Sequence, residues 1–306
     1  MPDESANGVR EPARVVVIGS GGRLGSALAS FLSREHSVVA LSRRELDLGS
    51  AASIRSALGG LEYDWLFLTG AVTGVDYCET HADEAHQVNA EAPRIIAEIS
   101  AEKGAHVTYI STDMVFDGAK AGPYLETDSP NPISVYGASK LAGEHGVLAA
   151  SADNLVARVS WVFGPGRPAF PEWIIGQSYA KEDLTLPGDK TACPTYTLDL
   201  IGWLDALVFA RPEGPASGIF HLCNSEPCSW RAWGQFCIDA ARDAGLPVIA
   251  REITPVAVDS VAAFVAKRPH NSAMDTEKFH NLTGIRPRGW RAAIRDHVLQ
   301  NIPQLQ

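Results

Sequence analysis

Residues 14–25 of the chain read RVVVIGSGGRLG, a short apolar run that leads directly into glycines. The run is continuous and mostly β-branched, which is typical of a parallel strand buried on both faces. Gly19, Gly22 and Gly25 then lead into a helical pattern over Leu24–Ser33. A turn whose backbone approaches a pyrophosphate excludes Cβ atoms, and the following helix N-terminus offers free N–H groups to the phosphates. The strand–loop–helix order therefore predicts a dinucleotide-binding site.

The chain beyond this stretch alternates apolar runs with helix-like segments. Further strands are expected at Val38–Leu41, Trp65–Leu68, His106–Ile110 and Leu155–Val159. Helices are expected at Glu84–Lys103, where Pro93 requires a local adjustment or a break, and from Val135 towards Ala149. Strands that alternate with helices predict an α/β fold built on a Rossmann-type, doubly wound parallel sheet.

The residue composition changes after Trp161, where prolines and glycines become frequent. Such residues mark irregular connections, so we expect a second, smaller α/β lobe that binds the substrate. One more short strand is expected at Ile219–Leu222. The predicted organisation is a disordered tail at 1–13, a Rossmann domain at 14–163 with a returning segment at about 190–224, and the substrate-binding lobe at 164–189 and 225–306.

The composition narrows the class of protein. The chain has 306 residues, with 26 Lys and Arg against 36 Asp and Glu, so its formal net charge is −10. This balance argues against nucleic acid as a partner, because nucleic-acid binding requires a basic surface. No apolar stretch approaches the roughly 20 residues of a membrane span, and the polar start of the chain is no signal peptide. Five scattered cysteines favour a reduced, cytoplasmic protein.

Two local features bear on ligands. Residues 251–306 carry eight Lys and Arg against five Asp and Glu, a net charge of +3. This segment suits an anionic substrate such as a phosphate ester, or it is simply a mixed surface. His221, Cys223 and Cys228 are close in sequence but fit no common zinc spacing, so we expect buried side chains there and no metal site.

The residues after the second expected strand bear on the choice of cofactor. A site specific for NAD usually places an acid there, which binds the ribose 2′-hydroxyl. This chain has Ser42, Arg43 and Arg44 instead. A small hydroxyl and guanidinium groups favour a 2′-phosphate, so NADPH is the predicted cofactor. The arginines could also be solvated loop residues, which leaves NADH possible.

Tyr136 and Lys140 are four residues apart and so lie on one face of the expected helix. A nearby ammonium stabilises a phenolate and brings the pKa of a tyrosine closer to the neutral range. Thr112 stands at the end of an earlier strand, where its hydroxyl can bind a substrate oxygen. Together with the glycine loop, these three residues predict a proton-transfer site beside the dinucleotide.

This combination resembles the extended short-chain dehydrogenase/reductase superfamily and, within it, the dTDP-4-dehydrorhamnose reductase family. The resemblance runs from Val15 to about Val298 and rests on motifs that occur in the family's order. They are ELDL at 45–48, VNAEAP at 88–93, STDMVFDG at 111–118, Pro123-Tyr124 with Glu126, Asn131-Pro132, YGASKLAGE at 136–144, RVSW at 158–161, Pro194-Thr195 and RPHNS at 268–272.

The resemblance implies a role for each matching residue. Thr112, Tyr136 and Lys140 would be catalytic. The cofactor contacts, from pyrophosphate to adenine to ribose, would be Gly22, Arg23, Leu24, Asp47, Leu48, Ala71, Val72 and Thr73. Asn89 would support the lysine through its helix. Asp113 and Trp161 would border the sugar, and Arg268 would contact a phosphate or pair with an acid.

The resemblance also implies the reaction. A hydride from NADPH would pass to the C4 ketone of a nucleotide-linked 6-deoxy-4-keto sugar. Tyr136 would donate the proton to the ketone oxygen, and Lys140 would also hold the nicotinamide ribose. The partner would be a small molecule, and the protein would be a monomer or a homodimer.

Three positions depart from the family's pattern. Met114 stands where members usually have a tyrosine beside the sugar, and Lys190 replaces their glutamine, so the substrate can differ. Ala27 lies in the region of a glutamate that bridges some members through a metal, which again predicts no structural metal. Met114 also argues against a nucleotide-sugar 4,6-dehydratase, because those enzymes have a glutamate base after Thr-Asp.

Two other functions stay open. The first is the reduction of a different carbonyl compound in specialised metabolism, which Met114 and Lys190 would suit. The second is a non-catalytic, NADP-binding subunit that resembles the regulatory subunit of methionine adenosyltransferase. The intact set of Thr112, Tyr136 and Lys140 favours an enzyme over that second function.

Overall fold

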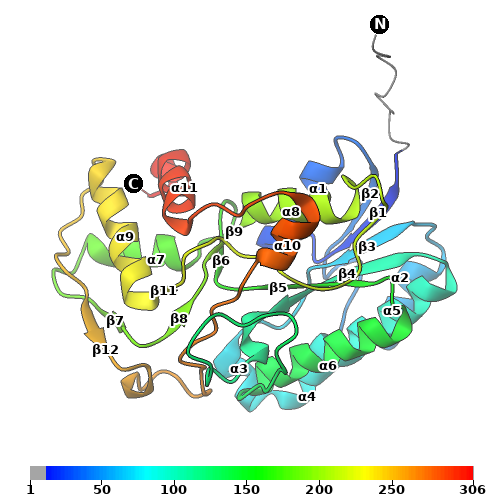
Figure 1. Ribbon diagram of the computed structural model, residues 1–306, viewed down its shortest axis with the longest axis horizontal. Helices are drawn as coiled ribbons and strands as arrows, with labels where there is room; N and C mark the ends of the chain where they lie inside the picture. The colour runs from blue at the N-terminus through cyan, green and yellow to red at the C-terminus, as the bar shows by residue number, and fades with distance from the viewer. Residues whose placement is uncertain (1–11, 306) are drawn as a thin grey trace, which may run out of the picture.

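The computed structural model describes residues 12–305, with side chains up to residue 300. The tail predicted at 1–13 lies outside the described residues except for Pro12 and Ala13. At the centre is a six-stranded parallel sheet of spatial order β10-β5-β4-β3-β1-β2 (Figure 1). Its strands are β1 (Arg14–Ile18), β2 (Ser37–Leu41), β3 (Trp65–Leu68), β4 (His106–Thr112), β5 (Leu155–Val159) and β10 (Gly218–His221).

Helices cover both faces of this sheet, as Figure 1 shows. The main ones are α1 (Arg23–Leu32), α2 (Ala51–Gly59), α5 (Ala92–Glu102), α6 (Val135–Ala150) and α8 (Thr197–Val208). Alternate residues of a strand point to opposite faces, so Val15 and Val17 share a core with α1 and α8. Val16 and Ile18 pack with α2, α5 and α6. The predicted Rossmann-type parallel sheet is confirmed.

The strand order reverses between β1 and β3, because β2 lies on one side of β1 and β3, β4, β5 and β10 lie on the other. In open α/β sheets the crevice for a ligand forms at such a point, beyond the carboxyl ends of the strands. The topology therefore predicts a binding site among the residues that follow β1, β3 and β4.

The predicted helix over 84–103 is interrupted. Over these residues the structure has the end of α4 (Ala82–His86), one π-helical turn (Gln87–Glu91) and then α5, which has Pro93 in its first turn; a further short helix, α3 (Val75–Thr80), precedes them. Proline has no N–H to donate to the carbonyl four residues earlier, which here belongs to Asn89. The expected adjustment at Pro93 thus takes the form of a wider turn that contains Asn89.

A second set of elements packs around its own apolar core, which includes the buried Trp233 and Trp290. Its helices are α7 (Phe170–Ser178), α9 (Trp230–Asp243) and α11 (Trp290–Leu305), and α10 (Glu277–Thr283) lies against β10. Short strand pairs complete it: β6 (Val162–Phe163) with β9 (Thr195–Tyr196), β7 (Thr185–Pro187) with β12 (Thr254–Val256), and β8 (Thr191–Ala192) with β11 (Cys228–Ser229). The boundaries of the two predicted lobes stay a prediction.

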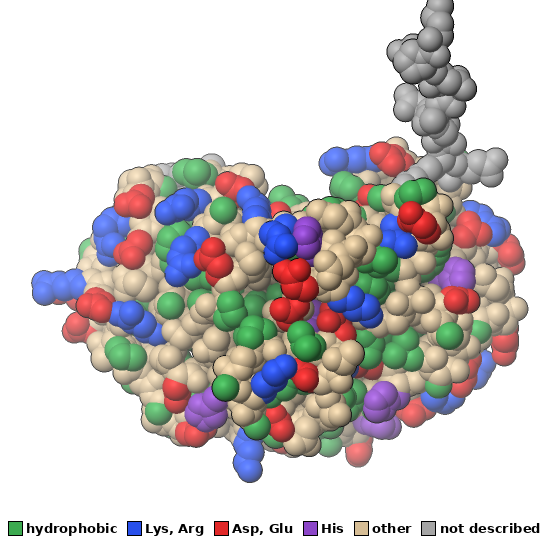
Figure 2. Space-filling model, viewed as in Figure 1, with side chains coloured by type: hydrophobic (Ala, Val, Ile, Leu, Met, Phe, Trp, Pro, Cys, Tyr) green, Lys and Arg blue, Asp and Glu red, His purple; other side chains and the backbone are tan. Residues whose placement is uncertain are grey.

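The surface carries charges of both signs. Figure 2 shows acidic and basic side chains interspersed over the face that it presents. Within residues 12–305, no helix combines the length and the hydrophobicity that a membrane span requires.

Candidate active site

A cavity of about 740 Å³ opens beyond the carboxyl ends of the central strands. Residues that end or follow β1, β2, β3, β4 and β5 line it, among them Ile18, Ser42, Thr69, Thr112 and Val159. This is the place that the reversal of strand order predicts. The lining of the cavity includes residues from both ends of the predicted cofactor site, namely the glycine loop and the Tyr136–Lys140 face of α6.

The glycine loop between β1 and α1 forms one wall of the cavity. A Cβ at Gly25 would lie 2.3 Å from the carbonyl oxygen of Gly19, so the close approach of helix and loop requires glycine there. Gly22 caps α1 without a side-chain hydrogen bond, so no side chain of the cap residue occupies the N–H groups of the first helical turn, whose residues line the cavity. Such an N-terminus, with its positive dipole end, suits a pyrophosphate.

Arg23 lies at the same wall but is already engaged. Its guanidinium donates hydrogen bonds to the carbonyl oxygens of Gly164 (2.8 Å) and Pro168 (3.0 Å). Burial lowers the pKa of Arg23 from its ordinary value. The residue therefore joins the glycine loop to the segment that follows β6, beside the predicted pyrophosphate position.

The other predicted cofactor residues lie around the same cavity. The lining includes Leu24, Ser42, Arg43, Asp47, Leu48, Ala71, Val72 and Thr73. Ser42 donates through its hydroxyl (2.5 Å) and its backbone N–H (2.9 Å) to the carboxylate of Glu45. The hydroxyl predicted to favour a 2′-phosphate thus has a carboxylate partner, and Arg43 is the cation nearest to it in sequence that lines the cavity.

The three predicted catalytic residues meet in this cavity. Ser134 caps α6 by accepting from the N–H of Gly137, and this places Tyr136 in the first helical turn with Lys140 one turn later. Thr112 ends β4. The expected shift of the Tyr136 pKa toward the neutral range was wrong, because burial raises this pKa and only a hydrogen bond with Thr112 opposes the rise. The phenol is therefore protonated near neutral pH, which is the form that a proton donor requires.

Lys140 is almost fully buried. Its ammonium donates a hydrogen bond to the carbonyl oxygen of Ile110 at 2.7 Å. Burial lowers the pKa of Lys140 to about 7, and the carboxylate of Glu144 opposes that change. Lys140 therefore loses its positive charge close to neutral pH.

The carboxylate of Asp113 forms the centre of a buried hydroxyl network. It accepts from Ser272 (2.5 Å), Ser160 (2.9 Å) and Thr112 (3.1 Å). Asp113 also lines the cavity. The network joins Asp113, next to the predicted catalytic Thr112, to Ser272, which lies 159 positions further along the chain.

Trp161 also lines the cavity, and its backbone φ is 43°. Its indole stacks on Trp230 at 5.5 Å and on Trp233 at 5.2 Å between ring centroids. This aromatic packing holds the ring at the cavity, where a sugar face could lie against it.

Three predicted residues lie outside the cavity lining. The side-chain amide of Asn89 accepts from the N–H of Val72 (2.9 Å) and donates to its carbonyl oxygen (2.9 Å) and to Ser139 (3.1 Å). It thus fastens the loop after β3 to α6. Met114 packs in a small apolar cluster with Tyr136. Arg268 pairs with Asp76 at 2.5 Å, so of its two predicted partners the structure shows the acid.

Lys190, the other departure from the family's pattern, is buried behind the cavity wall. Its ammonium donates to the carbonyl oxygen of Pro269 at 2.9 Å and lies 5.8 Å from the centroid of the Trp161 ring. Burial lowers the pKa of Lys190 to about 8, and the charge of Asp113 opposes the change.

Several residues in or behind the site were not predicted from the sequence. Arg167 and Glu84 line the cavity, and Ser160 and Ser272 bind Asp113. Ser160 and Ser272 stand inside motifs that carry the family resemblance, so the motifs held a signal for their place. Arg167 follows a Gly-Pro-Gly loop that offers no such signal.

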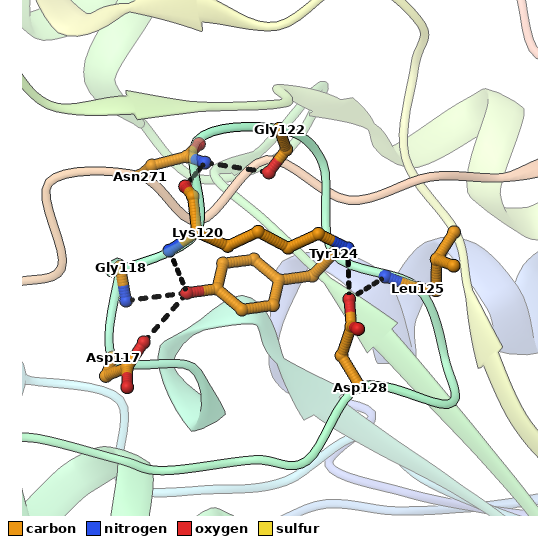
Figure 3. A network of polar contacts seen from close by, with 8 residues as sticks. All are labelled: Asp117, Gly118, Lys120, Gly122, Tyr124, Leu125, Asp128 and Asn271. Atoms are coloured by element: carbon orange, nitrogen blue, oxygen red, sulfur yellow. Dashed lines mark hydrogen bonds and ion pairs between the residues drawn. The ribbon is translucent and has the colours of Figure 1, made fainter.

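Further motif residues form a network of polar contacts around Asn271, the residue before Ser272 (Figure 3). The amide of Asn271 donates to the carbonyl oxygens of Lys120 (2.7 Å) and Gly122 (2.9 Å). The Tyr124 hydroxyl donates to Asp117 at 2.8 Å and accepts from the N–H groups of Gly118 and Lys120. This network ties the loop after β4 to the segment that carries Ser272, so these motif residues shape the site without entering it.

The sequence model of the RmlD substrate binding domain family matches residues 13–302, which is almost the whole described chain. The chain belongs to this family. Among curated RmlD-type relatives, dTDP-4-dehydrorhamnose reductase of Streptomyces griseus is 34% identical over 288 residues, 92% of each chain. The spore coat polysaccharide biosynthesis protein SpsK of Bacillus subtilis is 32% identical over 286 residues, 93% of this chain and 96% of SpsK.

A solved structure agrees with the family membership. The dTDP-4-dehydrorhamnose reductase of Bacillus anthracis, in complex with NADP, superimposes with a TM-score of 0.86 at 27% identity. The match covers 94% of this chain and 99% of that one. The resemblance drawn from the motifs is confirmed, and the chain is an oxidoreductase of the RmlD family.

Proposed function

We propose that the protein is an NADPH-dependent reductase of the C4 ketone of a nucleotide-linked 6-deoxy-4-keto sugar, similar to dTDP-4-dehydrorhamnose reductase. One observation carries this proposal. The hydroxyl groups of Tyr136 and Thr112 and the ammonium of Lys140 line the same cavity as the glycine loop after β1. A proton donor and a dinucleotide site in one cavity suit hydride transfer to a carbonyl.

The cavity fits a nicotinamide dinucleotide. The N-terminus of α1, which no side chain caps, suits a pyrophosphate, and Gly25 lets this helix approach the glycine loop closely. Ser42 and Arg43 would hold the adenosine ribose end, and Val72 and Lys140 the nicotinamide ribose. When bound, NADPH supplies the hydride. NADH is the second candidate, because Glu45 occupies the donors of Ser42.

The chain's own residues supply the proton and hold the ketone. Thr112 and Tyr136 would direct their hydroxyls at one substrate oxygen, for which the Thr112 hydroxyl would turn away from Asp113. Because burial keeps the Tyr136 phenol protonated, it can donate its proton as negative charge develops on that oxygen. The buried cation of Lys140 lies one turn later on the same helix and would stabilise the phenolate that remains.

The substrate side supports a sugar. Trp161 would offer its ring to one face, and Asp113 its remaining acceptor capacity to a hydroxyl. Arg268 would reach a phosphate only by leaving Asp76. We further propose a cytoplasmic protein that is a monomer or a homodimer.

A different carbonyl substrate is the second candidate, and Met114 and Lys190 favour it. Met114 presents a thioether packed against Tyr136 where the family has a phenol. Lys190 places a buried ammonium behind Trp161. The third candidate, a non-catalytic subunit, is less well supported because Thr112, Tyr136 and Lys140 all meet in the cavity.

NADPH oxidation in the presence of dTDP-4-keto-6-deoxymannose tests the proposal. We expect turnover by the wild-type protein and a loss of at least about 100-fold in kcat for Tyr136→Phe, because general acid catalysis contributes on this order. NADPH binding by that variant, measured by fluorescence, should stay intact. Turnover of simple ketones but of no nucleotide sugar would support the second candidate. No turnover of any carbonyl, despite NADPH binding, would support the third.

A further inference from the structure

Lys140 lines the cavity, and the groups around its ammonium come from three elements, β4, α6 and β5. Its ammonium meets the carbonyl oxygen of Ile110 and lies 3.9 Å from the centroid of the Tyr109 ring, both on β4. Glu144 follows one turn later on α6, and its carboxylate is held by Arg158 on β5 at 2.6 Å and by Ser111 at 2.5 Å. Only Tyr109 presents an aromatic face to the ammonium among these neighbours.

The hydroxyl of Tyr109 makes a separate contact, with the π-helical turn. It donates to the carbonyl oxygen of Asn89 at 2.7 Å. In a regular helix that carbonyl would accept from residue 93, which is proline and has no N–H. Tyr109 thus satisfies the acceptor that Pro93 leaves free in the π-helical turn, and the amide of the same Asn89 grips Val72 at the cofactor cavity.

The helix that carries Lys140 packs directly on this contact. A Cβ at Gly143 would lie 2.2 Å from the Asn89 carbonyl oxygen and 2.5 Å from the Tyr109 hydroxyl oxygen. Gly143 is three residues after Lys140, so it lies on the neighbouring helix face. The close approach therefore fixes the height of Lys140 above the Tyr109 ring.

We propose that Tyr109 is a positioning residue, whose ring holds the Lys140 ammonium in its charged form and whose hydroxyl locks the π-helical turn that carries Asn89. This inference rests on the proposed function, because it concerns the residue that would hold the nicotinamide ribose. The two halves of the role are separable, since the ring face acts on Lys140 and the hydroxyl acts on Asn89.

The ring has a consequence for pH dependence. The negative face of an aromatic ring favours a nearby cation, so it opposes the effect of burial on Lys140. Glu144 acts in the same direction, whereas burial acts against both. Weakening the ring's negative face lowers the pKa of Lys140, and functions that need the ammonium are then lost at lower pH.

The test compares two rings of nearly equal shape at position 109. Tyr109→Phe keeps the negative face and removes the hydroxyl, whereas pentafluorophenylalanine at position 109 reverses the charge distribution of the face. The first readout is the Kd of NADPH by fluorescence between pH 5.5 and 9, which needs no sugar substrate. The second is kcat with the keto sugar over the same range.

We expect affinity in the wild-type protein to weaken as Lys140 loses its proton. The midpoint should move down by about one pH unit with the fluorinated ring, relative to Tyr109→Phe. Tyr109→Phe itself should keep the wild-type midpoint but bind NADPH several-fold more weakly at pH 6, because the Asn89 turn loses its lock. Equal midpoints for the two rings would overturn the role of the ring, and unchanged affinity in Tyr109→Phe would overturn that of the hydroxyl.

Tyr63 offers a matched control. It is also buried and its hydroxyl bonds to Ser100 at 3.0 Å, away from the cavity lining. The same two substitutions at position 63 should leave the midpoint unchanged, and an equal shift there would show a general effect on stability instead. If the wild-type protein binds NADPH but reduces no keto sugar, the proposed substrate fails while the binding profile still decides the role of Tyr109.

Discussion

At the scale of single residues, close approach decides which positions accept change. In the glycine loop, Gly25 and Gly21 meet different neighbours. A Cβ at Gly25 would lie 2.3 Å from a backbone oxygen, whereas at Gly21 it would meet only the Ser42 side chain at 3.7 Å. Backbone atoms cannot yield as a flexible side chain can, so the two glycines differ in what they contribute.

Gly25→Ala is therefore expected to displace α1 from the loop and weaken NADPH binding by at least about tenfold, the equivalent of roughly 1.4 kcal/mol. Titration of the protein with NADPH by fluorescence or calorimetry measures this. Gly21→Ala is the matched control and should bind within about twofold of the wild-type protein. If both variants bind alike, the close approach at Gly25 has no part in cofactor binding.

At the scale of elements, buried contacts between distant segments hold α6 and the loop after β4 in place. Glu144 of α6 and Arg158 of β5 form an ion pair whose side chains are each 1% exposed. Arg94 and Glu98 on α5 form a pair of similar length whose side chains are each 43% exposed. A buried charge that loses its partner is far more costly than an exposed one.

Glu144→Gln should thus lower the free energy of unfolding by about 3 kcal/mol or more, because it leaves the Arg158 charge uncompensated. The comparison variant, Glu98→Gln, should lower it by less than about 1 kcal/mol. Urea unfolding followed by circular dichroism gives both values. Equal losses would mean that water reaches the Glu144–Arg158 pair.

The loop after β4 provides a second test at this scale. Gly118 has a φ of +84°, and a Cβ there would lie 2.8 Å from the N atom of His270. Gly118→Ala should push away the segment that carries Ser272, which binds Asp113, and we expect kcat to fall by roughly tenfold or more with stability reduced by about 1–3 kcal/mol. Gly122→Ala, in open space in the same loop, should change neither. If Gly118→Ala keeps the wild-type kcat, the position of the segment that carries Ser272 does not affect catalysis.

Sequence reasoning succeeded where a signal is local. The glycine loop, the strands from β1 to β5 and the Tyr136–Lys140 spacing each depend on a few consecutive residues, and the cavity brings them together. The partners of Arg268 and Asp113 lie 192 and 159 residues away, respectively. Periodicity carries no information on such pairs, because tertiary packing selects them. For the same reason the role of Tyr109 beneath Lys140 was not visible in the sequence.

At the scale of the whole molecule, the pH dependence of stability includes a buried histidine at the sheet edge. Burial, with the charge of Arg158 as a second cause, lowers the pKa of His221 to about 3. The unfolded chain binds a proton at this residue below its ordinary pKa of 6.5, whereas the folded chain does not until about 3. Unfolding therefore takes up a proton in this range, and stability falls as the pH falls from about 6.5 to 3.

His221→Phe removes this titration. Between pH 7 and pH 5 the wild-type protein should lose about 2 kcal/mol of unfolding free energy more than the variant does. Denaturant unfolding at both pH values measures the difference, so any constant cost of the larger ring cancels. Parallel losses in the two proteins would show that His221 takes up a proton in the folded state.

The backbone conformation of Trp161 lowers the stability of the folded protein. Its φ of 43° lies in a region that L-residues avoid, at a cost of about 1–2 kcal/mol. The indoles of Trp230 and Trp233 hold the ring where a sugar would rest against it. Selection for heat resistance alone would act against this tryptophan, whereas selection for turnover would preserve it, so thermostable relatives that relax this position should be slower enzymes.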